Sequence, residues 1–351
     1  ITHGKGLMMV RRAHSTILLG IVLASAATIF LSLLIGAETI SFGQAWHEWR
    51  SGASPAESPM LGILVQQRLP RTLAALIVGA GLALAGCAFQ AMLRNPLAEP
   101  YTLGVASAGA LGAWTATVLV AGYGMPRAWL GIPAVQLFAF LFAEADILIV
   151  YLLAARKDRV SPSVLLLGGV TMGMLANSGI LLMRYLADPE RLVTMDRWLM
   201  GGVDVLGYRP VATLFLGVTP CLIILWAQAA KLDQLGFGAD LAEGRGVNVK
   251  RLQVITFGVS SLMTGIVVSV VGPIGFIGLI VPHAVRSLTG SRHRLLMPAS
   301  IVAGGGFLCF CDILARKILP GETPIGIVTT LFGGPFFLYL LMRRRFTDWE
   351  T

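Results

Sequence analysis

The sequence is poor in charged residues. Asp, Glu, Lys and Arg make up 13% of its 351 residues, whereas apolar residues make up 56%. Soluble domains carry roughly 25% charged residues, so this chain has too little polar surface to coat a water-soluble globule. Cysteine is scarce as well, and a small buried hydrophobe is the simplest interpretation of each one. All four lie inside apolar stretches: Cys87, Cys221, Cys309 and Cys311. They predict neither a disulfide framework nor a metal site.

Motifs for nucleotide binding and hydrolysis are also missing. The phosphate-cradling pattern G-x-x-x-x-G-K-[ST] does not occur, so we expect this chain to bind no ATP, metal or other cofactor. The zinc motif H-E-x-x-H and the nucleophile elbow G-x-S-x-G are absent too, and no catalytic residue is predicted. A membrane enzyme acting on a lipid or quinone would need histidines with carboxylates at one depth. The five histidines instead scatter among the tail, loops and span ends: His3, His14, His47, His283 and His293.

Long apolar stretches dominate what is present. Ten of them are candidates to cross a bilayer: 16–37, 71–92, 101–121, 133–154, 162–186, 210–230, 253–272, 275–289, 297–318 and 325–342. Most have the length that a hydrocarbon core of about 30 Å requires at about 1.5 Å per helical residue. Glycine is abundant, at 41 residues, and helix packing in lipid favours small residues. The sequence predicts an all-α integral membrane protein, with 1–351 as a single transmembrane domain of about ten helices.

The basic residues predict the orientation. The net charge is +9, and lysine and arginine cluster between the apolar stretches, which favours a membrane rather than nucleic acid as the partner. An even number of spans places both termini on one side. If that side is the cytoplasm, most of the 27 lysine and arginine residues fall inside. We therefore expect a multi-pass protein of a bacterial inner membrane, surrounded by lipid, with both termini cytoplasmic and 1–15 as a cytoplasmic tail.

Residues 231–252, between the sixth and seventh spans, form a polar inside segment with helix-like spacing of its apolar residues. Its glycines allow tight turns between two short helices: Gly236, Gly238, Gly244 and Gly246. A transporter without a motor of its own must receive force from a cytoplasmic partner, and a compact amphipathic segment suits a groove on such a partner. The alternative is an ordinary surface loop.

Three arginines are predicted near the outer membrane surface. Arg68 and Arg71 lie where the second span begins, and Arg316 lies near the outer end of the ninth. Exposed arginines at this level are able to pair with carboxylates of a soluble partner and fix its orientation. Snorkelling to lipid headgroups is an equal alternative.

Proline and glycine interrupt the chain between the seventh and eighth stretches, at 272–278. Such residues at membrane depth break helices where protein or a cavity covers the backbone. The segment is therefore either a gate in a pathway or a tight turn between helices. The candidates for the pathway or gate are Pro273, Gly275, Phe276 and Gly278.

Glu144 and Asp146 lie in the middle of the fourth stretch. An intramembrane carboxylate costs about 2.5 kcal/mol or more unless it is paired, protonated or hydrated. The pair suggests a proton or cation site, and with it an alternative class of function, an ion-coupled secondary transporter. Two residues apart on a helix, the side chains point about 200° from each other, so they cannot form one tight site. Otherwise the span boundaries are wrong and the pair lies beside a water-filled cleft.

The second and third spans carry an ordered set of motifs. The set comprises Arg68-Leu-Pro-Arg71, Gly79, Gly81, Gly86, Gln90, Arg94-Asn-Pro-Leu-Ala-Glu-Pro100, Leu103-Gly104 and Gly109-Ala110. The C-terminal half adds Gly275-Phe-Ile-Gly-Leu-Ile-Val-Pro-His283 with Arg286, Asp312-Ile-Leu-Ala-Arg316, Glu322-Thr-Pro-Ile-Gly326 and Gly333-Gly-Pro335. In these motifs the chain resembles, from about 16 to 345, the FecCD family of ABC-importer permeases.

The resemblance implies a type II ABC importer permease architecture with ten spans, in which two copies of the chain form a homodimer around a central pathway. Two cytoplasmic ATPase subunits, which hold ATP and Mg²⁺, would grip the segment 231–252, and a periplasmic binding protein would deliver the solute. The implied coupling positions are Leu235, Gly238, Ala239, Glu243, Gly246 and Val247. Arg68, Arg71 and Arg316 match the arginines that meet acidic residues of the binding protein. Glu144 and Asp146 depart from the family, which usually has small apolar residues there.

Substrates of the family are large iron or cobalt chelates. The resemblance favours haem, with a ferric siderophore or cobalamin as the alternatives. No single residue decides among them. Apolar and small side chains along such a pathway would let a bulky chelate slide without a deep trap.

Overall fold

The computed structural model describes residues 2–36, 42–52, 54–55, 58–155, 160–318 and 323–342. The helices in chain order are α1 (Thr2–Leu34), α2 (Phe42–Arg50), α3 (Pro59–Gly62), the π-helical η1 (Ile63–Arg68), α4 (Leu69–Leu93), the 3-10 helix η2 (Pro100–Leu103), α5 (Val105–Tyr123), α6 (Ala134–Ala154), α7 (Pro162–Leu186), α8 (Pro189–Leu199), α9 (Arg209–Ala227), α10 (Ala229–Leu235), α11 (Ala239–Gly244), α12 (Val249–Val271), α13 (Ile277–Thr289), α14 (His293–Ile318) and α15 (Ile325–Met342). A short antiparallel hairpin of β1 (Ala128–Trp129) and β2 (Ile132–Pro133) joins α5 to α6.

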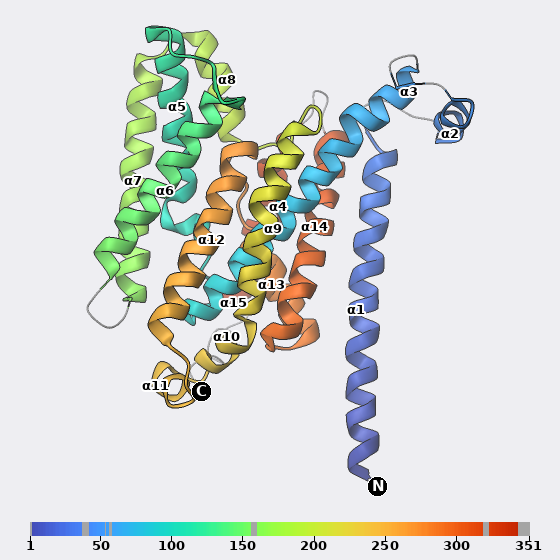
Figure 1. The fold of residues 1–351 in the computed structure, drawn as a ribbon, viewed down its shortest axis with the longest axis vertical. Coiled ribbons are helices and arrows are strands. Elements are labelled where there is room, and N and C mark those ends of the chain that lie inside the picture. The colour runs from blue at the N-terminus through green and yellow to red at the C-terminus, as the bar shows by residue number, and fades with distance from the viewer. Residues whose placement is uncertain are drawn as a thin grey trace.

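Eight helical segments within the described residues are long and apolar enough to cross a membrane. Two shorter apolar helices, α13 and the last helix α15, occupy the two remaining predicted stretches. The prediction of an all-α membrane protein with about ten transmembrane helices is therefore confirmed. Figure 1 shows the N-terminus of α1 and the helices α10 and α11 at one end of the bundle, which we call the inner end. The opposite end, where α2, α3 and α8 lie, is the outer end.

The second span differs from its predicted bounds. It begins at Pro59 rather than at 71, because α3, η1 and α4 run on as one segment of 35 residues. Pro70 lacks an N–H and its ring crowds the preceding turn. The six residues before Leu69 accommodate it with wider π-helical hydrogen bonding. At about 1.5 Å per residue the segment is about 52 Å long, and it crosses the bundle obliquely (Figure 1). Arg68 and Arg71 therefore lie inside a long helix, not in a loop before it.

The core forms around α4, which contacts α14, α12, α13 and α9. Glycine permits the closest of these approaches. A methyl group on Gly79 would collide with the carbonyl oxygen of Gly304 in α14, and one on Gly86 would collide with Gly278 in α13. Small residues allow helix backbones to touch in this way in membrane proteins. The family motif glycines of the second span thus set the distance between α4 and its neighbours.

A second group of helices, α5, α6 and α7, packs beside this core and is closed at the outer end by α8 (Figure 1). The fully buried Trp114 of α5 and Met195 of α8 lie in one apolar cluster. Helix α8 lies in the connection between the predicted spans 162–186 and 210–230.

Helix α1 begins well before the predicted first span, 16–37. Residues from Thr2 onward are helical and continue α1, which runs beyond the other helices at the inner end (Figure 1). The basic run 343–345 and Glu322 lie outside the described residues.

Candidate functional site

The inner segment 231–252 folds as predicted, into two short helices. Gly238 and Gly246 have φ angles of +114° and +82°, which favour glycine, and they bound α11 on both sides. Leu235 and Val247, two of the predicted coupling residues, are buried and fix the segment to the bundle. Glu243 and Gly246 are exposed, and Gly238 and Ala239 are half-buried.

The exposed surface of this segment carries two apolar residues that are not among the predicted coupling positions. Phe237 is 68% exposed and Leu241 is 58% exposed. The guanidinium carbon of Arg245 lies 5.6 Å from the centre of the Phe237 ring, so a cation–π contact orders the two side chains. Phe237 stands between Gly236 and Gly238, and an aromatic residue in a glycine-rich polar turn was the available signal. These side chains offer a small apolar knob at the inner end.

Asp233 of α10 joins the segment to the first residue of α14. Its Oδ1 accepts hydrogen bonds from the backbone N–H of His293 at 2.8 Å and from Nδ1 of the same residue at 2.7 Å. Burial by itself would raise the pKa of Asp233, but the hydrogen bonds and charge of His293, together with the charge of Arg292, hold that pKa below its ordinary value. The pair therefore ties α10 to the start of α14.

The interruption between α12 and α13 is a true helix break. Gly272 and Phe276 have φ angles of +69° and +70°, so the chain turns at both ends of 272–276. The backbone N–H of Phe276, the residue before α13, donates to the carboxylate of Glu99. The side-chain amide of Gln90 donates to the carbonyl of Gly278 at 3.0 Å. Contacts from the second span and the loop after it thus hold the break in place.

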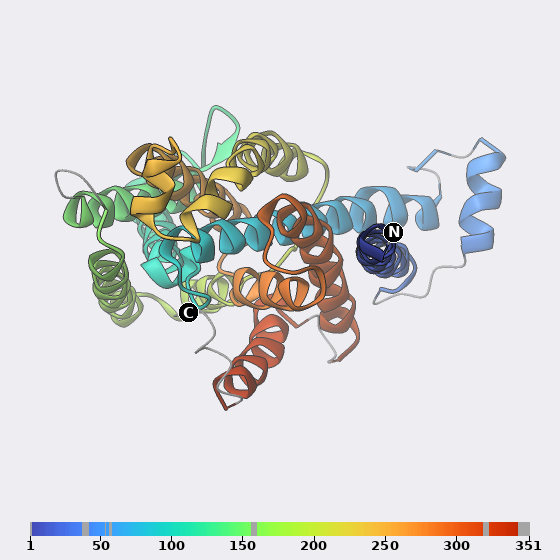
Figure 2. The ribbon, with the colours of Figure 1, turned by 90° about the horizontal axis from the view of Figure 1, so that it is seen from below.

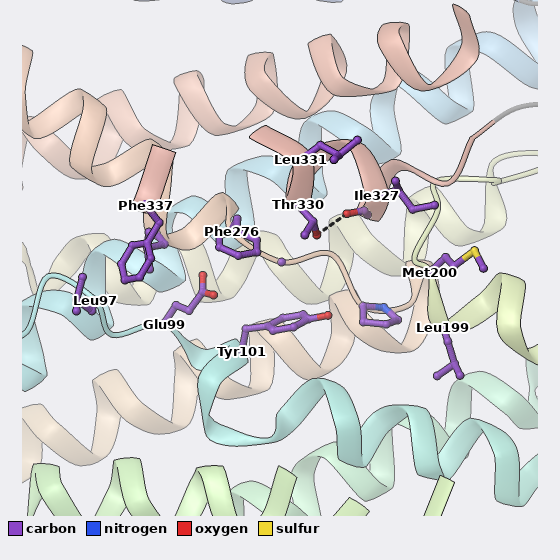
Figure 3. A pocket seen from close by; sticks show the side chains of 14 residues that line it. Leu97, Glu99, Tyr101, Leu199, Met200, Phe276, Ile327, Thr330, Leu331 and Phe337 are labelled. Atoms are coloured by element: carbon purple, nitrogen blue, oxygen red, sulfur yellow. Dashed lines mark hydrogen bonds between the residues drawn. The ribbon is translucent and has the colours of Figure 1, made fainter. Parts of the chain in front are cut away.

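A cavity of about 670 Å³ lies beside this break (Figure 3). Of the predicted pathway candidates, Pro273, Gly275 and Phe276 line it, whereas Gly278 is buried against Gly86. Leu279 of α13 lines it too, and the other lining residues come from three distant parts of the chain: Leu97, Glu99, Tyr101, Leu199, Met200, Gly326, Ile327, Thr330, Leu331 and Phe337. Figure 3 shows the Tyr101 ring and the Glu99 carboxylate on the side opposite Thr330. Local sequence patterns missed these residues because only the tertiary fold brings them together.

A second cavity, of about 410 Å³, adjoins the first and shares Tyr101, Leu199 and Pro273 with it. It is lined by α5 and α7, with Asn177 and Arg184 as polar residues. Tyr101, Leu199 and Pro273 therefore form the boundary between the two hollows.

The three arginines expected at the outer surface do not stand exposed. Arg68 is 5% exposed and donates to the carbonyls of Leu33 and Leu34 at the end of α1. Arg316 is 6% exposed and pairs with Asp312 one turn earlier. The expected exposure is wrong for both, because the long second span carries Arg68 into the bundle and α14 extends past Arg316.

Arg71 is less buried, with 12% of its side chain exposed. Its Nε lies 2.9 Å from Oδ1 of the fully buried Asp312, and its Nη1 lies 3.4 Å from Oδ1 of Asp204. Asp312 therefore pairs with two arginines, Arg71 and Arg316. Asp204, which is about half exposed, extends this group of ion pairs to the outer surface. The docking role of Arg68, Arg71 and Arg316 stays a prediction.

Glu144 and Asp146 both lie on α6, and they face different neighbours. Glu144 Oε1 lies against Gly265 of α12, whereas Asp146 lies against Gly104, where α5 begins. Asp146 is 2% exposed, and both of its carboxylate oxygens are buried without a hydrogen-bond partner. Within the described residues, no group of three or more His, Cys, Asp or Glu side chains is arranged to hold a metal ion.

These features define a class, a multi-span membrane protein with a helix break, cavities beside that break and a compact two-helix segment at its inner end. The family model of the FecCD transport family matches residues 21–343, and the chain belongs to this family.

Individual relatives agree with that assignment. The chain is 33% identical to the hemin transport system permease protein HmuU of Yersinia pestis, over 95% of this chain and 98% of the relative. It is 34% identical to the vitamin B12 import system permease protein BtuC of Shigella boydii, over 90% of this chain and 92% of the relative. A solved ABC transporter assigned to the metal-chelate type, in an inward-facing conformation, superimposes with a TM-score of 0.79 at 30% identity, covering 94% of this chain and 99% of the other.

Proposed function

We propose that this chain is the membrane permease subunit of an ATP-driven importer for a large iron or cobalt chelate, with haem as the first candidate. The observation that carries the proposal is the inner segment α10–α11. It presents Phe237 and Leu241 outward on a base held by Leu235, Ala242 and Val247. The chain has no phosphate-binding motif, so an exposed apolar knob at this place suits a separate ATPase subunit.

The proposed coupling follows from the contacts of this segment. Two ATPase subunits, carrying ATP and Mg²⁺, would move α10 and α11 of two copies of this chain. Because Asp233 holds His293, the motion would pass to α14 and from there to α4, against which α14 packs through Gly304 and Gly79. The helix break at 272–276 and its cavity lie against the same helices, so access to the cavity would change with the nucleotide state.

Homodimer formation is part of the proposal. The exposed faces of α7 and α15 beside the cavities are apolar, with Met174, Leu181 and Leu331 about two thirds exposed. A second copy packed against them would bury these side chains and close a central pathway over both sets of cavities. The inner end would then face the cytoplasm, with both termini on that side of a bacterial inner membrane.

We propose that a periplasmic binding protein docks at the outer end. Arg71 and Asp204 would face the partner. Beneath them, Arg68 and Arg316 hold the outer ends of α1, the second span and α14 together. Charge complementarity at such a surface governs encounter and orientation more than affinity.

The substrate class rests on the relatives and on the cavity lining. Relatives named for hemin and vitamin B12 are equally similar to this chain, at 33% and 34% identity. The lining is mostly apolar with the Tyr101 and Phe276 rings, which suits the flat face of a porphyrin or corrin. A ferric siderophore is the remaining alternative. Uptake of haem, cobalamin and a ferric siderophore into proteoliposomes holding the complete transporter would rank the three.

The coupling proposal is tested by co-purification with the ATPase subunit. Phe237→Ser and Leu241→Ser should each lower the amount of ATPase retained and the rate of solute-stimulated ATP hydrolysis. Lys231→Ala, an exposed change on the same segment, is the matched control and should leave both unchanged. Retention of the ATPase at wild-type levels by the Phe237→Ser, Leu241→Ser double variant would overturn the proposal.

A further inference from the structure

Helix α2 has no role in transport as described above, yet it carries two exposed tryptophans. It spans Phe42–Arg50, shortly after α1 ends at Leu34. Trp46 is 52% exposed and Trp49 is 61% exposed. Three residues apart on a helix, they share one face, and their ring centres lie 5.1 Å apart. His47 is exposed as well and, at 100° per residue, lies on a different face from this aromatic pair.

The orientation of α2 separates it from the spans. In Figure 1, α1 runs lengthwise and α2 is seen nearly end-on, level with the outer end of α1. Figure 2, turned by 90°, shows α1 end-on and α2 lengthwise at the edge of the molecule. Helix α2 therefore lies across the direction of the spans, away from the central bundle.

A hydrogen bond on a side other than the tryptophan face ties α2 to the start of the second span. The hydroxyl of Ser58 donates to the carboxylate of Glu48, and the same hydroxyl oxygen accepts the N–H of Leu61 as the cap of α3. The polar side of α2 is thus fixed to the start of the second span, and the two indole rings are left at the surface.

We propose that α2 is an interfacial anchor that lies in the outer leaflet of the bilayer, with Trp46 and Trp49 among the lipid headgroups and upper acyl chains. A short amphipathic helix lying flat in the interface buries its apolar face at this level. Tryptophan concentrates there because its ring is apolar and its N–H is polar. Arg50, exposed at the end of α2, is placed to meet lipid phosphate.

Continuity with the lipid-facing surface selects lipid rather than a soluble partner as the occupant. The adjoining helix α1 exposes Leu19, Leu23 and Phe30, each more than half exposed. These side chains require acyl chains around them. Because α2 follows α1 at its outer end (Figure 1), its aromatic pair lies at the level where the lipid around α1 meets the membrane surface.

The anchor fixes the depth of the outer corner of the subunit. Arg68 binds the last carbonyls of α1, and Ser58 binds α2, so α1, α2 and the start of the second span form one connected corner. Held at the interface, this corner gives the long second span a fixed end while its inner end moves.

The experiment places a spin label on each face of α2 in the full chain, within the complete transporter in lipid nanodiscs. Trp46→Cys puts the label on the aromatic face, and His47→Cys is the matched control one residue away. The four native cysteines are buried, and the unsubstituted chain measures any background labelling. Collisions with oxygen, which concentrates in lipid, are compared with collisions with a water-soluble nickel chelate.

The label at 46 should show a several-fold higher ratio of oxygen to nickel accessibility than the label at 47. Equal, water-like ratios at both positions would overturn the proposal. So would a label at 46 that is water-exposed until the periplasmic binding protein is added and then becomes shielded, because that outcome identifies a protein as the occupant. Unchanged thermal stability of both variants shows that the fold is retained.

Discussion

Asp233 caps helix α14 by accepting both the backbone N–H and the Nδ1–H of His293 at one carboxylate oxygen. An ionised carboxylate only accepts hydrogen bonds, so the proton of this bond lies on Nδ1 of the histidine. The pair is a direct polar connection between the inner segment and a membrane-spanning helix.

Asp233→Asn should weaken this connection and remove a pH-dependent part of stability. Because the folded pKa of Asp233 lies below its unfolded value, the pair stabilises the fold above about pH 4, the ordinary aspartate value, and this contribution is lost as the pH falls through the folded value. We expect a loss of about 1–2 kcal/mol at neutral pH and a flatter decline of the melting temperature in acid. Asp240→Asn, an exposed carboxylate on α11, is the control, and an identical acid decline in wild type and Asp233→Asn would contradict the assignment.

Asp312→Asn should be among the most damaging single changes at the outer end. It removes the negative charge shared by Arg71 and Arg316 while both stay largely buried. Breaking a buried ion pair from one side costs about 3–5 kcal/mol, and thermal unfolding in detergent measures it. Asp188→Asn breaks an ion pair whose carboxylate is 70% exposed, and its effect should stay below about 1 kcal/mol. Equal effects of the two changes would show that burial does not govern this cluster.

Asp146→Ala should stabilise the protein and leave ATP-driven uptake intact. Both carboxylate oxygens are buried without a hydrogen-bond partner, and an unsatisfied buried polar group costs about 1–3 kcal/mol. Glu144→Ala, on the same helix but only partly buried, should gain less. Uptake in proteoliposomes is measured with ATP and with an imposed proton gradient. If either variant abolished uptake driven by the gradient alone, the ion-coupled mechanism would replace the ATP-driven one.

Gly86→Ala should destabilise the fold by about 1–3 kcal/mol, because the added methyl group meets the backbone of Gly278 rather than a movable side chain. Gly334→Ala is the control. It lies in helix α15 with no atom within 4 Å of the added carbon, so the change should be neutral or slightly stabilising. Comparable melting temperatures for the two variants would mean that the α4–α13 contact yields without cost.

The spans were predictable because length and apolarity alone decide whether a helix crosses lipid. The inner segment was predictable for a similar reason, since its glycines and apolar spacing are local. The start of the second span was not, because Pro70 is a natural helix-start signal and only packing shows that a π-helical turn carries the helix past it. The burial of Arg68 and Arg316 depends on the carbonyls of α1 and on Asp312, which are distant in sequence.

The residues that line the cavity likewise divide into those that local sequence reveals and those that only the fold brings together. Pro273, Gly275 and Phe276 were found because proline and glycine mark a helix break directly. Tyr101 and Thr330 were missed because nothing within their own neighbourhoods places them opposite each other. Phe237 was missed for a different reason: its place in a glycine-rich polar turn was a signal, but the structure was needed to show that its ring is exposed.

The contact of Gly79 with Gly304 has a mechanical consequence. Two helices whose backbones touch cannot slide or roll past each other without a clash, so α4 and α14 form a single rigid body. Conformational change must therefore be concentrated where no such contact exists. Gly104 and Leu103 touch the backbone of α7 at Gly169 in the same way, which ties η2 and the start of α5 to α7, so relative movement falls between these close-packed groups and not within them.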